Sequence, residues 1–516
     1  MTGNNKTRKG RAQLIAERIT SMKSGRNGQA KEIKNPFQPA GVFSDDFIET
    51  LHEKALEILE CYGIRILLPE AVKLFKKNGA RVASDGQMVF IGKEIVSSAI
   101  ASAPKQYTVK AGAQNRDVVM QLGNLVFQPG AGAAYTTDRL RGRRVGREED
   151  YRELVQLTHH FDSLHMIPPL VEPQDIPTQF RHYSLLEAKL ILSDKVPHIF
   201  SRGTPQVSES FEMLQNFRGL SDQEFKDNAY SYTVINTNSP RQIDAPMAQG
   251  VIDFARFGQL AIITPFTLMG AMAPITVAGA ITLSHAEALA TISLSQLSRA
   301  GAPVCYGTFT SNVDMKTGAP AFGTPEHFRA SLAAGQLARY LGLPWRCASG
   351  SASNVNDAQA ANETQFGAWG CLLAGATVII HAAGWLEGGL TVGYEKLIND
   401  MEFIQMITNL CQNYPEKIED IGMEAIESVP PGGHFFDSPH TMSRYKDEFY
   451  THLVGDLSNY GTWKENGALD SDARATKIWK SILKENNRPF QSQCKVEELQ
   501  EFIRRRTAAG GAPSVS

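Results

Sequence analysis

The stretch Tyr230-Ser-Tyr-Thr-Val-Ile-Asn-Thr237 decides the fold, because it is one of eight short apolar runs that recur through the middle of the chain. Each run is rich in β-branched or aromatic residues, and segments of about 12 to 25 residues with helical periodicity separate the runs. A parallel strand that helices cover has this pattern, because both of its faces are buried. The predicted strands are Leu125–Gln128, Leu164–Leu170, Pro197–Ser201, Tyr230–Thr237, Ile263–Gly270, Pro303–Phe309, Pro344–Ser349 and Thr377–His381.

Eight strand–helix units close naturally into a (β/α)8 barrel, in which the loops after the strands carry the chemistry. The sequence therefore predicts an α/β fold of the TIM-barrel type with helical N- and C-terminal extensions. The expected divisions are a flexible N-terminal arm (1–40), a helical N-terminal extension (41–120), the barrel (121–411), a helical C-terminal extension (412–505) and a disordered tail (506–516).

Composition and charge narrow the classes of function. The chain of 516 residues is 42% hydrophobic with a formal net charge of −2, so no global charge attracts nucleic acid or an anionic membrane. The apolar stretch Ala261–Leu283 contains two prolines, and we expect a buried strand and helix there rather than a membrane span. Six cysteines without a C-x-x-C pair, and no expected signal peptide, favour the reducing cytoplasm.

Metal and phosphate motifs are weak. The twelve histidines form no H-x-H or H-E-x-x-H pattern, so we expect no metal held by the chain. Gly130-Ala131-Gly132 follows the first strand but lacks the third glycine and the downstream acidic residue of a dinucleotide site. We expect a tight turn at this position.

The residues at the strand ends are polar, almost uncharged and interleaved with aromatic rings. Any one ring is more simply explained by packing, but together such rings offer their faces to a soft cation. The candidates are Asn236 after the fourth strand, Tyr306 and Phe309 in the sixth, Gly350 after the seventh, and His381 and Trp385 at and after the eighth.

Two acidic residues have simple structural explanations. Glu287 lies in an otherwise apolar helix, Ile275–Leu297, and a buried carboxylate needs a partner. We expect that partner to be Arg299 or a neighbouring strand end. Asp357 opens the helix Asp357–Leu373 and is most simply its N-cap.

Several of these segments, in order and at similar spacing, resemble the trimethylamine methyltransferase family. They include Met269-Gly-Ala-Met-Ala-Pro-Ile-Thr-Val-Ala-Gly279, Asp314-Met-Lys-Thr-Gly318, Leu343-Pro-Trp-Arg346, Asp357-Ala-Gln-Ala-Ala361 and His381-Ala-Ala-Gly-Trp-Leu-Glu-Gly-Gly389. The resemblance covers residues from about 40 to about 480. It implies the same barrel fold and transfer of a methyl group from an amine to cobalt of a separate corrinoid protein.

The founding members of that family carry pyrrolysine in the segment that corresponds to the loop after strand seven. Here Cys347–Asp357 contains only ordinary, mostly small residues. The chain therefore resembles the non-pyrrolysine branch, whose characterised members demethylate quaternary amines such as glycine betaine.

A quaternary ammonium leaves as a neutral tertiary amine, and Co(I) of the corrinoid is the nucleophile, so we expect no catalytic side chain. A strong negative partner would stabilise the substrate cation more than the transition state. We expect a cage of aromatic rings such as Tyr306, Phe309 and Trp385. The carboxylate grip is expected from Arg202, Arg346 or His381, aided by backbone N–H groups of the Gly350 loop, with Asn236 among the substrate-binding residues.

The resemblance implies that the corrinoid (cobalamin) comes from a partner protein, with no permanently bound cofactor and tetrahydrofolate as the final methyl acceptor. That partner is expected over the barrel mouth, where the polar face of the helix starting at Asp357 is one candidate surface. Self-association is left open. Two other functions also stay open: a non-catalytic quaternary-amine-binding scaffold, and a metal-independent barrel lyase, although no lysine lies in or just after the eight predicted strands.

Overall fold

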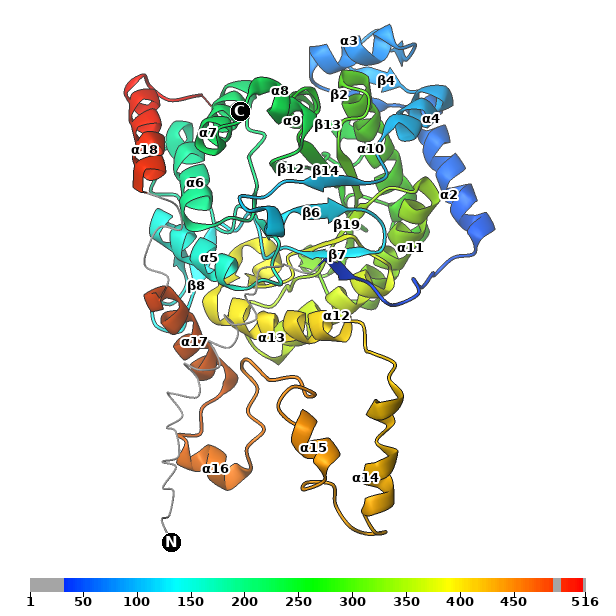
Figure 1. Cartoon of the computed structure of the whole chain (residues 1–516). Coiled ribbons are helices and arrows are strands. Elements are labelled where there is room, and N and C mark those ends of the chain that lie inside the picture. Colours follow the sequence, from blue (N-terminus) through cyan, green and yellow to red (C-terminus); the bar gives the residue numbers. More distant parts are fainter. Residues whose placement is uncertain (1–31, 486–492, 514–516) are drawn as a thin grey trace.

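The computed structural model describes residues 32–485 and 493–513, and contains a closed barrel of eight parallel strands (Figure 1). Hydrogen-bonded pairing runs through six of them without a break, and His198 bridges the third strand to Tyr232 of the fourth. The His165 amide donates to the Phe127 carbonyl and joins the first strand to the second. The strands are β7 (Asn124–Phe127), β10 (Met166–Ile167), β11 (Val196–Pro197), β12 (Tyr232–Ile235), β14 (Leu260–Ile263), β16 (Val304–Gly307), β19 (Trp345–Ala348) and β20 (Val378–Ile380).

Helices separate successive strands and surround the barrel, which confirms the predicted (β/α)8 fold class. Side-chain caps fix several helix starts: Thr276, Thr324 and Asp357 each accept a hydrogen bond from the backbone N–H three residues on. The predicted N-cap role of Asp357 is thus confirmed. The helices are α5 (Glu148–His160), α6 (Thr178–Leu192), α7 (Thr204–Arg218), α8 (Asp222–Asp227), α9 (Ala245–Arg256), α10 (Val277–Ser298), α11 (Pro325–Leu341), α12 (Ala358–Leu373) and α13 (Tyr394–Leu410).

Alternate residues of each strand enter two different apolar cores. One core fills the barrel and includes Tyr232, Ile262 and Cys305. The larger core lies between the strands and the helices and includes Tyr306 and Trp345. Strand parity therefore decides which side chains can reach a ligand at the mouth.

The predicted fifth strand, Ile263–Gly270, is wrong in position. The barrel strand β14 ends at Ile263, and Pro265 separates it from a second strand, β15 (Phe266–Met269). Proline lacks the N–H that a continuous ladder requires. β15 pairs instead with β17 (Phe309–Val313), which pairs with β18 (Pro320–Ala321), and these strands form a small sheet above strands five and six.

A second small sheet lies above strands eight and one. Its strands are β21 (Trp385–Leu386), β22 (Thr391–Gly393), β8 (Tyr135–Thr137) and β9 (Arg144–Val145), with the short 3-10 turn η3 (Glu387–Gly389) between the first two. We call these two sheets the rim sheets, because they extend the loops at the carboxyl ends of the barrel strands.

The N-terminal extension lies against one side of the barrel and contains strands as well as helices. Ser44 caps its first helix by accepting from the Phe47 amide, and a hairpin pairs Arg81 with Phe90. Its elements are β1 (Ile33–Lys34), α2 (Asp45–Glu57), η1 (Ile58–Tyr62), β2 (Ile64–Ile66), α3 (Pro69–Lys77), β3 (Arg81–Val82), β4 (Met88–Phe90), α4 (Lys93–Ser102), β5 (Tyr107–Val109), η2 (Gln114–Arg116) and β6 (Val118–Met120).

The predicted arm and tail need correction where they fall on described residues. β1 pairs with β7, and the Ala40 amide donates to the Leu373 carbonyl, so residues 32–40 are ordered against the barrel. Near the C-terminus, Ala512 is 2% exposed and its carbonyl accepts from Gln206. Residues 1–31 and 514–516 of these predictions lie outside the described residues.

The C-terminal extension leaves the end of α13 and projects away from the barrel before α17 returns to pack on α13 (Figure 1). Its elements are η4 (Ile418–Ile421), α14 (Met423–Ser428), α15 (Pro439–Arg444), α16 (Tyr460–Glu465), α17 (Ser471–Glu485) and α18 (Gln493–Ala508). Among the described helices, α10 has the length and composition to cross a membrane, but its residues from Ala280 to Gln296 are all buried inside the protein.

Candidate active site at the barrel mouth

The rim sheets bring aromatic side chains from distant parts of the chain together at the barrel mouth. Phe309 opens β17, Phe322 follows β18, and Trp385 opens β21. The ring centroids are 5.3 Å apart for Phe309 and Phe322, 5.1 Å for Phe322 and Trp385, and 5.9 Å for Phe309 and Trp385. Phe266 of β15 lies 5.1 Å from Phe309. We call Phe266, Phe309, Phe322, His381 and Trp385 the aromatic cluster.

The Trp385 ring is fixed by backbone that only glycine leaves room for. A Cβ atom on Gly350 would lie 2.2 Å from Trp385 Cε3, and one on Gly389 would lie 2.4 Å from Trp385 Cζ2. Gly130 brings a third backbone segment to the same ring. Gly350 therefore holds the cage wall, which adds a role to the predicted one of offering N–H groups to the substrate.

His381 joins the cluster as a neutral ring. Burial, and then the nearby Arg346 charge, hold the pKa of His381 well below its ordinary value. Its Nδ1 lies 3.3 Å from the Ala131 backbone nitrogen and accepts that N–H, which leaves the proton on Nε2. A neutral imidazole can donate a hydrogen bond to a carboxylate but cannot form an ion pair with it.

Arg346 is a buried cation beside this cluster. Its side chain comes from β19, is 2% exposed, and places the guanidinium carbon 4.9 Å from the Phe309 ring centroid. Nη1 donates to Thr264 Oγ1 at 2.7 Å and to the Thr308 carbonyl at 3.1 Å, whereas Nε has no partner among the described residues. Burial lowers the pKa of Arg346 to about 10, so the side chain stays protonated at neutral pH.

Two other residues with unpartnered buried polar atoms were not found by sequence reasoning. Gln128 Nε2 and His198 Nδ1 have no hydrogen-bond partner among the described residues, and neither has Nε1 of the predicted residue Trp385. Gln128 Oε1 accepts from Tyr232 Oη at 2.7 Å, and Tyr232 belongs to the core inside the barrel. Gln128 ends the predicted first strand and His198 lies in the predicted third strand. Their position in these strands was the sequence signal that could have pointed to them.

Glu363 of α12 organises the loop after strand seven. Its Oε2 accepts from Ser351 Oγ at 2.7 Å, from the Ala352 amide at 2.9 Å and from the Ser353 amide at 3.2 Å. The Glu387 amide in turn donates to the Ser353 carbonyl at 2.9 Å, which connects this loop to the turn after Trp385. Glu363, one of the polar residues in the first half of α12, therefore holds the loop after strand seven in place rather than facing a partner protein.

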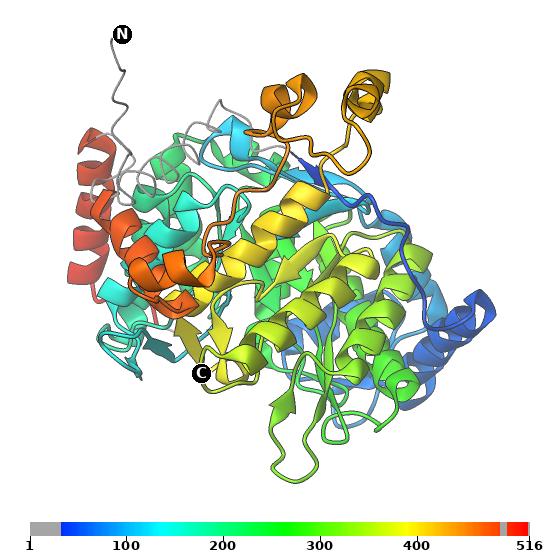
Figure 2. The same ribbon diagram turned by 90° about the horizontal axis from the view of Figure 1, so that it is seen from below.

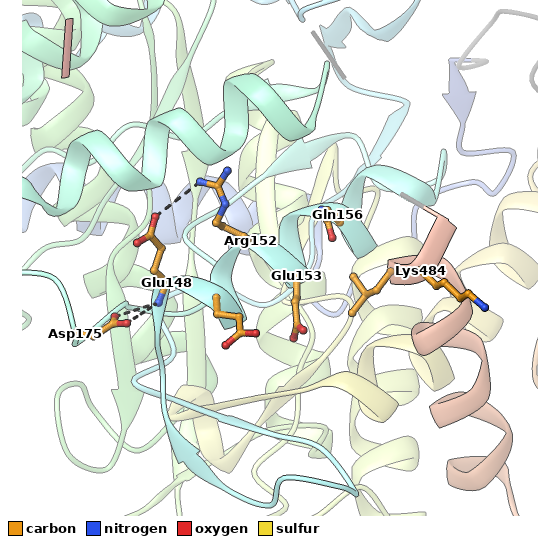
Figure 3. Close-up of a pocket in the computed structure, with 8 residues that line it drawn as sticks. Glu148, Arg152, Glu153, Gln156, Asp175 and Lys484 are labelled. Carbon is orange, nitrogen blue, oxygen red and sulfur yellow. Dashed lines mark hydrogen bonds and ion pairs between the residues drawn. The ribbon is translucent and has the colours of Figure 1, made fainter. Parts of the chain in front are cut away.

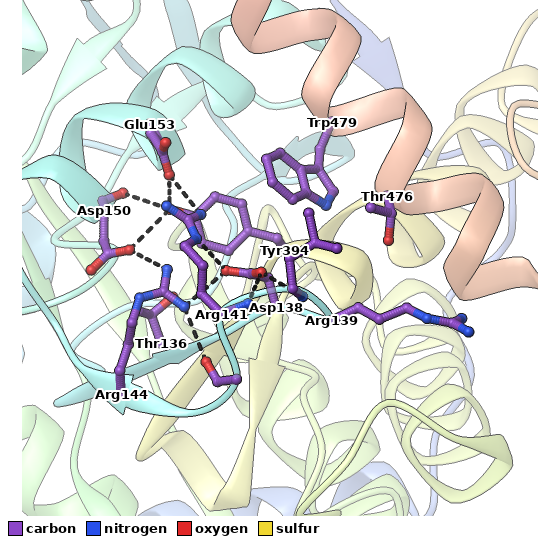
Figure 4. Close-up of polar contacts among 12 residues, drawn as sticks. Thr136, Asp138, Arg139, Arg141, Arg144, Asp150, Glu153, Tyr394, Thr476 and Trp479 are labelled. Atoms are coloured by element: carbon purple, nitrogen blue, oxygen red, sulfur yellow. Dashed lines mark hydrogen bonds and ion pairs between the residues drawn. The ribbon is translucent and has the colours of Figure 1, made fainter.

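An ionic network joins the segment around β8 and β9 of the second rim sheet to the start of α5 (Figure 4). Asp138 accepts from Arg141 Nε at 2.7 Å and from Arg144 Nη1 at 2.8 Å, and Arg144 also pairs with Asp150. Nearby, two parallel hydrogen bonds of 2.8 and 2.9 Å join Arg143 to Glu387 in the turn after Trp385. That pair holds Glu387 at a φ of 52°, in the left-handed region.

The structure contradicts the prediction for Tyr306. Its side chain is completely buried in the outer core, and its hydroxyl lies 3.0 Å from His285 Nδ1 on α10. His285 Nε2 lies 3.0 Å from His52 Nδ1 of the N-terminal extension. Tyr306 faces the helices because it alternates with the inward-facing Cys305, so it does not line the mouth.

Other predicted residues lie at the mouth in different settings. Arg202 pairs with Glu172 at 2.7 Å, and the same carboxylate also accepts from Arg181 at 2.6 Å, so Arg202 already has an acidic partner that it shares. Asn236 is exposed at the end of β12. Glu287 is held by the neighbouring strand end: it accepts from Thr237 Oγ1, from Ser239 Oγ at 2.6 Å and from the Arg241 amide at 2.7 Å. The alternative partner, Arg299, donates to the Lys226 carbonyl instead.

A separate cavity lies away from the aromatic cluster, between α5 and α17 (Figure 3). Its volume is about 720 Å³, and its lining includes Glu148, Glu149, Glu153 and Asp175. Arg152 and Lys484 partly balance these acids, so the lining has no feature that selects a ligand. Among the described residues, no group of three or more His, Cys, Asp or Glu side chains could hold a metal ion.

Known proteins are similar over nearly the whole chain. The model of a family described as trimethylamine methyltransferase (MTTB) matches residues 6–511. The glycine betaine methyltransferase of Desulfitobacterium hafniense (strain Y51) is 32% identical over 467 residues, which are 90% of this chain and 97% of that protein. The trimethylamine methyltransferase MttB of D. hafniense (strain DSM 10664 / DCB-2) is 30% identical over 87% of this chain and 90% of that protein.

A solved structure is also similar in outline. The crystal structure of the Methanosarcina barkeri monomethylamine methyltransferase (MtmB) gives a TM-score of 0.46 at 9% sequence identity, over 97% of this chain and 93% of that one.

Proposed function

The chain belongs to the trimethylamine methyltransferase (MTTB) family, and from that premise we propose that it moves a methyl group from a quaternary, betaine-type amine to Co(I) of a separate corrinoid protein. Members of this family are corrinoid-dependent methyltransferases that act on methylated amines. The proposal adds the identity of the substrate, a betaine, to the reaction that the family carries out. The cobalt belongs to the partner protein, so it enters the reaction as a second substrate.

One observation carries the choice of a betaine: Arg346 is buried beside the aromatic cluster without an acidic partner among the described residues. A buried cation is costly unless an anion pairs with it. The carboxylate of a betaine supplies that anion, and the unpartnered Nε of Arg346 supplies a donor for it. Trimethylamine has no group that would neutralise this charge.

The aromatic cluster suits the other end of the same molecule. Ring faces attract a trimethylammonium group through their quadrupoles without a formal negative charge. The positive charge on nitrogen fades as the C–N bond breaks, so a carboxylate beside it would favour the bound substrate over the transition state. Phe309 lies between Arg346 and Trp385, which places the two ends of a betaine in adjoining parts of the site.

The reaction balances without an acid or base from the protein. The electron pair of Co(I) forms the new bond to the methyl carbon, and the C–N pair returns to nitrogen. The products are methyl-Co(III) on the corrinoid protein and a neutral tertiary amine, with no proton transferred. The chain's own contribution is to bind the carboxylate, orient the methyl group and exclude water.

The two other functions make different predictions. A scaffold would bind betaines but leave Co(I) unchanged. A lyase that forms an imine would need a free lysine at the mouth. Burial lowers the pKa of Lys189 to about 7, but its Nζ donates to the His198 carbonyl at 2.6 Å from helix α6, outside the barrel.

The test is a mixing experiment with free cob(I)alamin. The protein is combined with cob(I)alamin and either glycine betaine, other betaines or trimethylamine, and the Co(I) absorbance is followed. We expect methylcobalamin and one equivalent of tertiary amine with a betaine, and no reaction with trimethylamine. Tight betaine binding without Co(I) consumption would favour the scaffold.

The role of Arg346 has its own test. Calorimetry with glycine betaine and with tetramethylammonium separates the carboxylate grip from the cage. We expect Arg346→Met to weaken betaine binding at least 30-fold, because one member of a buried charged pair is lost, and to leave tetramethylammonium binding within threefold. Arg202→Met is the control, since Arg202 already pairs with Glu172. If Arg202→Met weakened betaine binding and Arg346→Met did not, Arg202 would be the residue that binds the carboxylate.

The compartment is also part of this proposal. All six cysteines are free, and four of them are buried. This supports a cytoplasmic enzyme that needs no structural disulfide.

A further inference from the structure

Large apolar side chains stand exposed on the loops at the barrel mouth. They occur after the first, fifth, sixth, seventh and eighth strands, and their exposed fractions range from 44% for Val145 to 67% for Met315. At the opposite end, the described loops that lead from a helix into the next barrel strand expose no large apolar side chain, and Tyr414 is exposed only where the chain leaves α13 for the C-terminal extension. The residues are Leu140, Val145, Ile275, Met315, Val355 and Leu390.

These loops form one continuous sector, because strands five, six, seven, eight and one are neighbours around the barrel. The loop after the fourth strand is already covered: its strand β13 (Gln242–Ile243) pairs with β2 of the N-terminal extension. The loops after strands five to one, which carry the exposed apolar side chains, therefore lie above the aromatic cluster. We call Ile275, Met315, Val355, Leu390, Leu140 and Val145 the apolar sector.

Ile275 and Met315 lie at the outer edge of this sector. Both approach Gly270, since a Cβ built there would lie 3.1 Å from Met315 Sδ and 3.8 Å from Ile275 Cγ1. Met315 sits at the tip of the β17–β18 hairpin, whose first residue is Phe309 of the aromatic cluster. This hairpin projects beyond the ring of helices at the lower edge of Figure 2. The β17–β18 hairpin thus carries an exposed apolar side chain at its tip, Met315, and a ring of the aromatic cluster at its first residue, Phe309.

We propose that the apolar sector is the docking surface for the corrinoid protein, an inference that rests on the proposed function. The reacting cobalt must come within bonding distance of a methyl group held against the rings of Phe309 and Trp385. A protein that brings it there must cover the loops that carry these two residues. Exposed apolar side chains around a site are typical of the centre of a protein–protein interface.

A second copy of this chain fits the position less well. A copy seated over strands five to one would cover the entrance through which cobalt has to arrive. The other large group of exposed apolar residues, which includes Ile418, Met423 and Phe436, lies in the C-terminal extension. That group offers a matched control surface away from the mouth.

The experiment compares two methyl acceptors with the full-length enzyme and glycine betaine. Free cob(I)alamin is small and needs no docking surface, whereas the corrinoid protein that the enzyme methylates, reduced to Co(I), does. The variants are Ile275→Lys and Met315→Lys, and the control is Met423→Lys, whose side chain is 63% exposed. Initial rates are measured against acceptor concentration.

We expect both rim variants to raise the half-saturating concentration of the corrinoid protein at least tenfold and to keep the rate with free cob(I)alamin within twofold. Met423→Lys should change neither rate. Unchanged saturation by the corrinoid protein in both rim variants, or an equal effect of Met423→Lys, would overturn the docking surface. A change in the molar mass of either rim variant, measured by light scattering, would also overturn the docking surface, because the sector would then join copies of this chain. Failure of the proposed function looks different, because the unmodified enzyme would then methylate neither acceptor.

Discussion

The His381 imidazole lies almost parallel to the Trp385 indole, with ring centroids 4.2 Å apart and ring planes 11° from parallel. Because Gly350 and Gly389 contact the same indole, the ring has no room to swing away. The wall of the cage is therefore in place before substrate arrives. Pre-organisation of this kind lowers the entropic cost of holding a methyl group in line for attack.

The first prediction concerns Gly350→Ala. The added methyl would lie 2.2 Å from Trp385 Cε3, so the indole must move. We expect glycine betaine affinity, measured by calorimetry, to fall at least tenfold. Gly123→Ala is the control, because Gly123 has a φ of +90° but no atom within 4 Å of the new Cβ, so it reports backbone strain alone. Equal losses in the two variants would mean that Trp385 is not held in this way.

The second prediction separates Tyr306 of barrel strand β16 from Phe309, which opens β17 of the rim sheet. Tyr306→Phe removes a hydroxyl that bonds to His285 behind the strand, so we expect a loss of about 1 kcal/mol in the free energy of unfolding and an unchanged KM for betaine. Phe309→Leu removes a ring from the mouth, so we expect KM to rise about tenfold. Urea unfolding and steady-state kinetics on both variants test this, and a KM effect confined to Tyr306→Phe would reverse the assignment.

The fold was readable from the sequence because a covered parallel strand leaves a strong signal. Tyr230–Thr237 has aromatic or β-branched residues on both faces, and the helices between strands are long enough for the crossover. The same signal misplaced the fifth strand. Leu260–Ile263 and Phe266–Met269 are both apolar, one in the barrel and one in the rim sheet, and burial alone does not distinguish them.

The site was less predictable because it depends on parity and on long-range contacts. A fully apolar strand gives no sign of which residues point inward, which is why Tyr306 was placed beside Phe309. Phe322 and Glu363 reach the site through a hairpin and a helix, so no local pattern marks them. Arg346 was a candidate by its strand-end position, but its lack of an acidic partner is visible only in three dimensions.

The third prediction tests the loop after strand seven. Glu363→Gln leaves one oxygen in place of a carboxylate that accepts from Ser351 Oγ and two backbone amides. We expect faster hydrogen exchange at the Ala352 and Ser353 amides and about a tenfold lower kcat/KM, with a loss of about 2 kcal/mol in unfolding free energy. Glu326→Gln, on the first turn of α11, is the exposed control. Unchanged exchange at residues 352 and 353 would contradict this role.

The fourth prediction is a pH dependence at Asp138, in the network that supports the rim sheet. Burial alone would raise the pKa of Asp138, but hydrogen bonds from the Arg141 backbone and side chain and from the Leu140 amide outweigh it and lower the pKa below 3.8. An acid with a lowered pKa in the folded protein stabilises it above the unfolded-state pKa. That contribution is lost as pH falls through the folded-state pKa.

Asp138→Asn should therefore cost about 3 kcal/mol of unfolding free energy near pH 7, because two arginines lose a shared buried partner. The difference from the unmodified protein should shrink as the pH falls below 3.8. Chemical unfolding at several pH values measures it. Asp85→Asn is the matched control: Asp85 also accepts two backbone amides in a turn, but it is exposed, and Arg65 acts on it through its charge without a hydrogen bond among the described residues. A difference for Asp138→Asn that stayed constant down to acid pH would mean that its carboxylate charge contributes nothing to the rim.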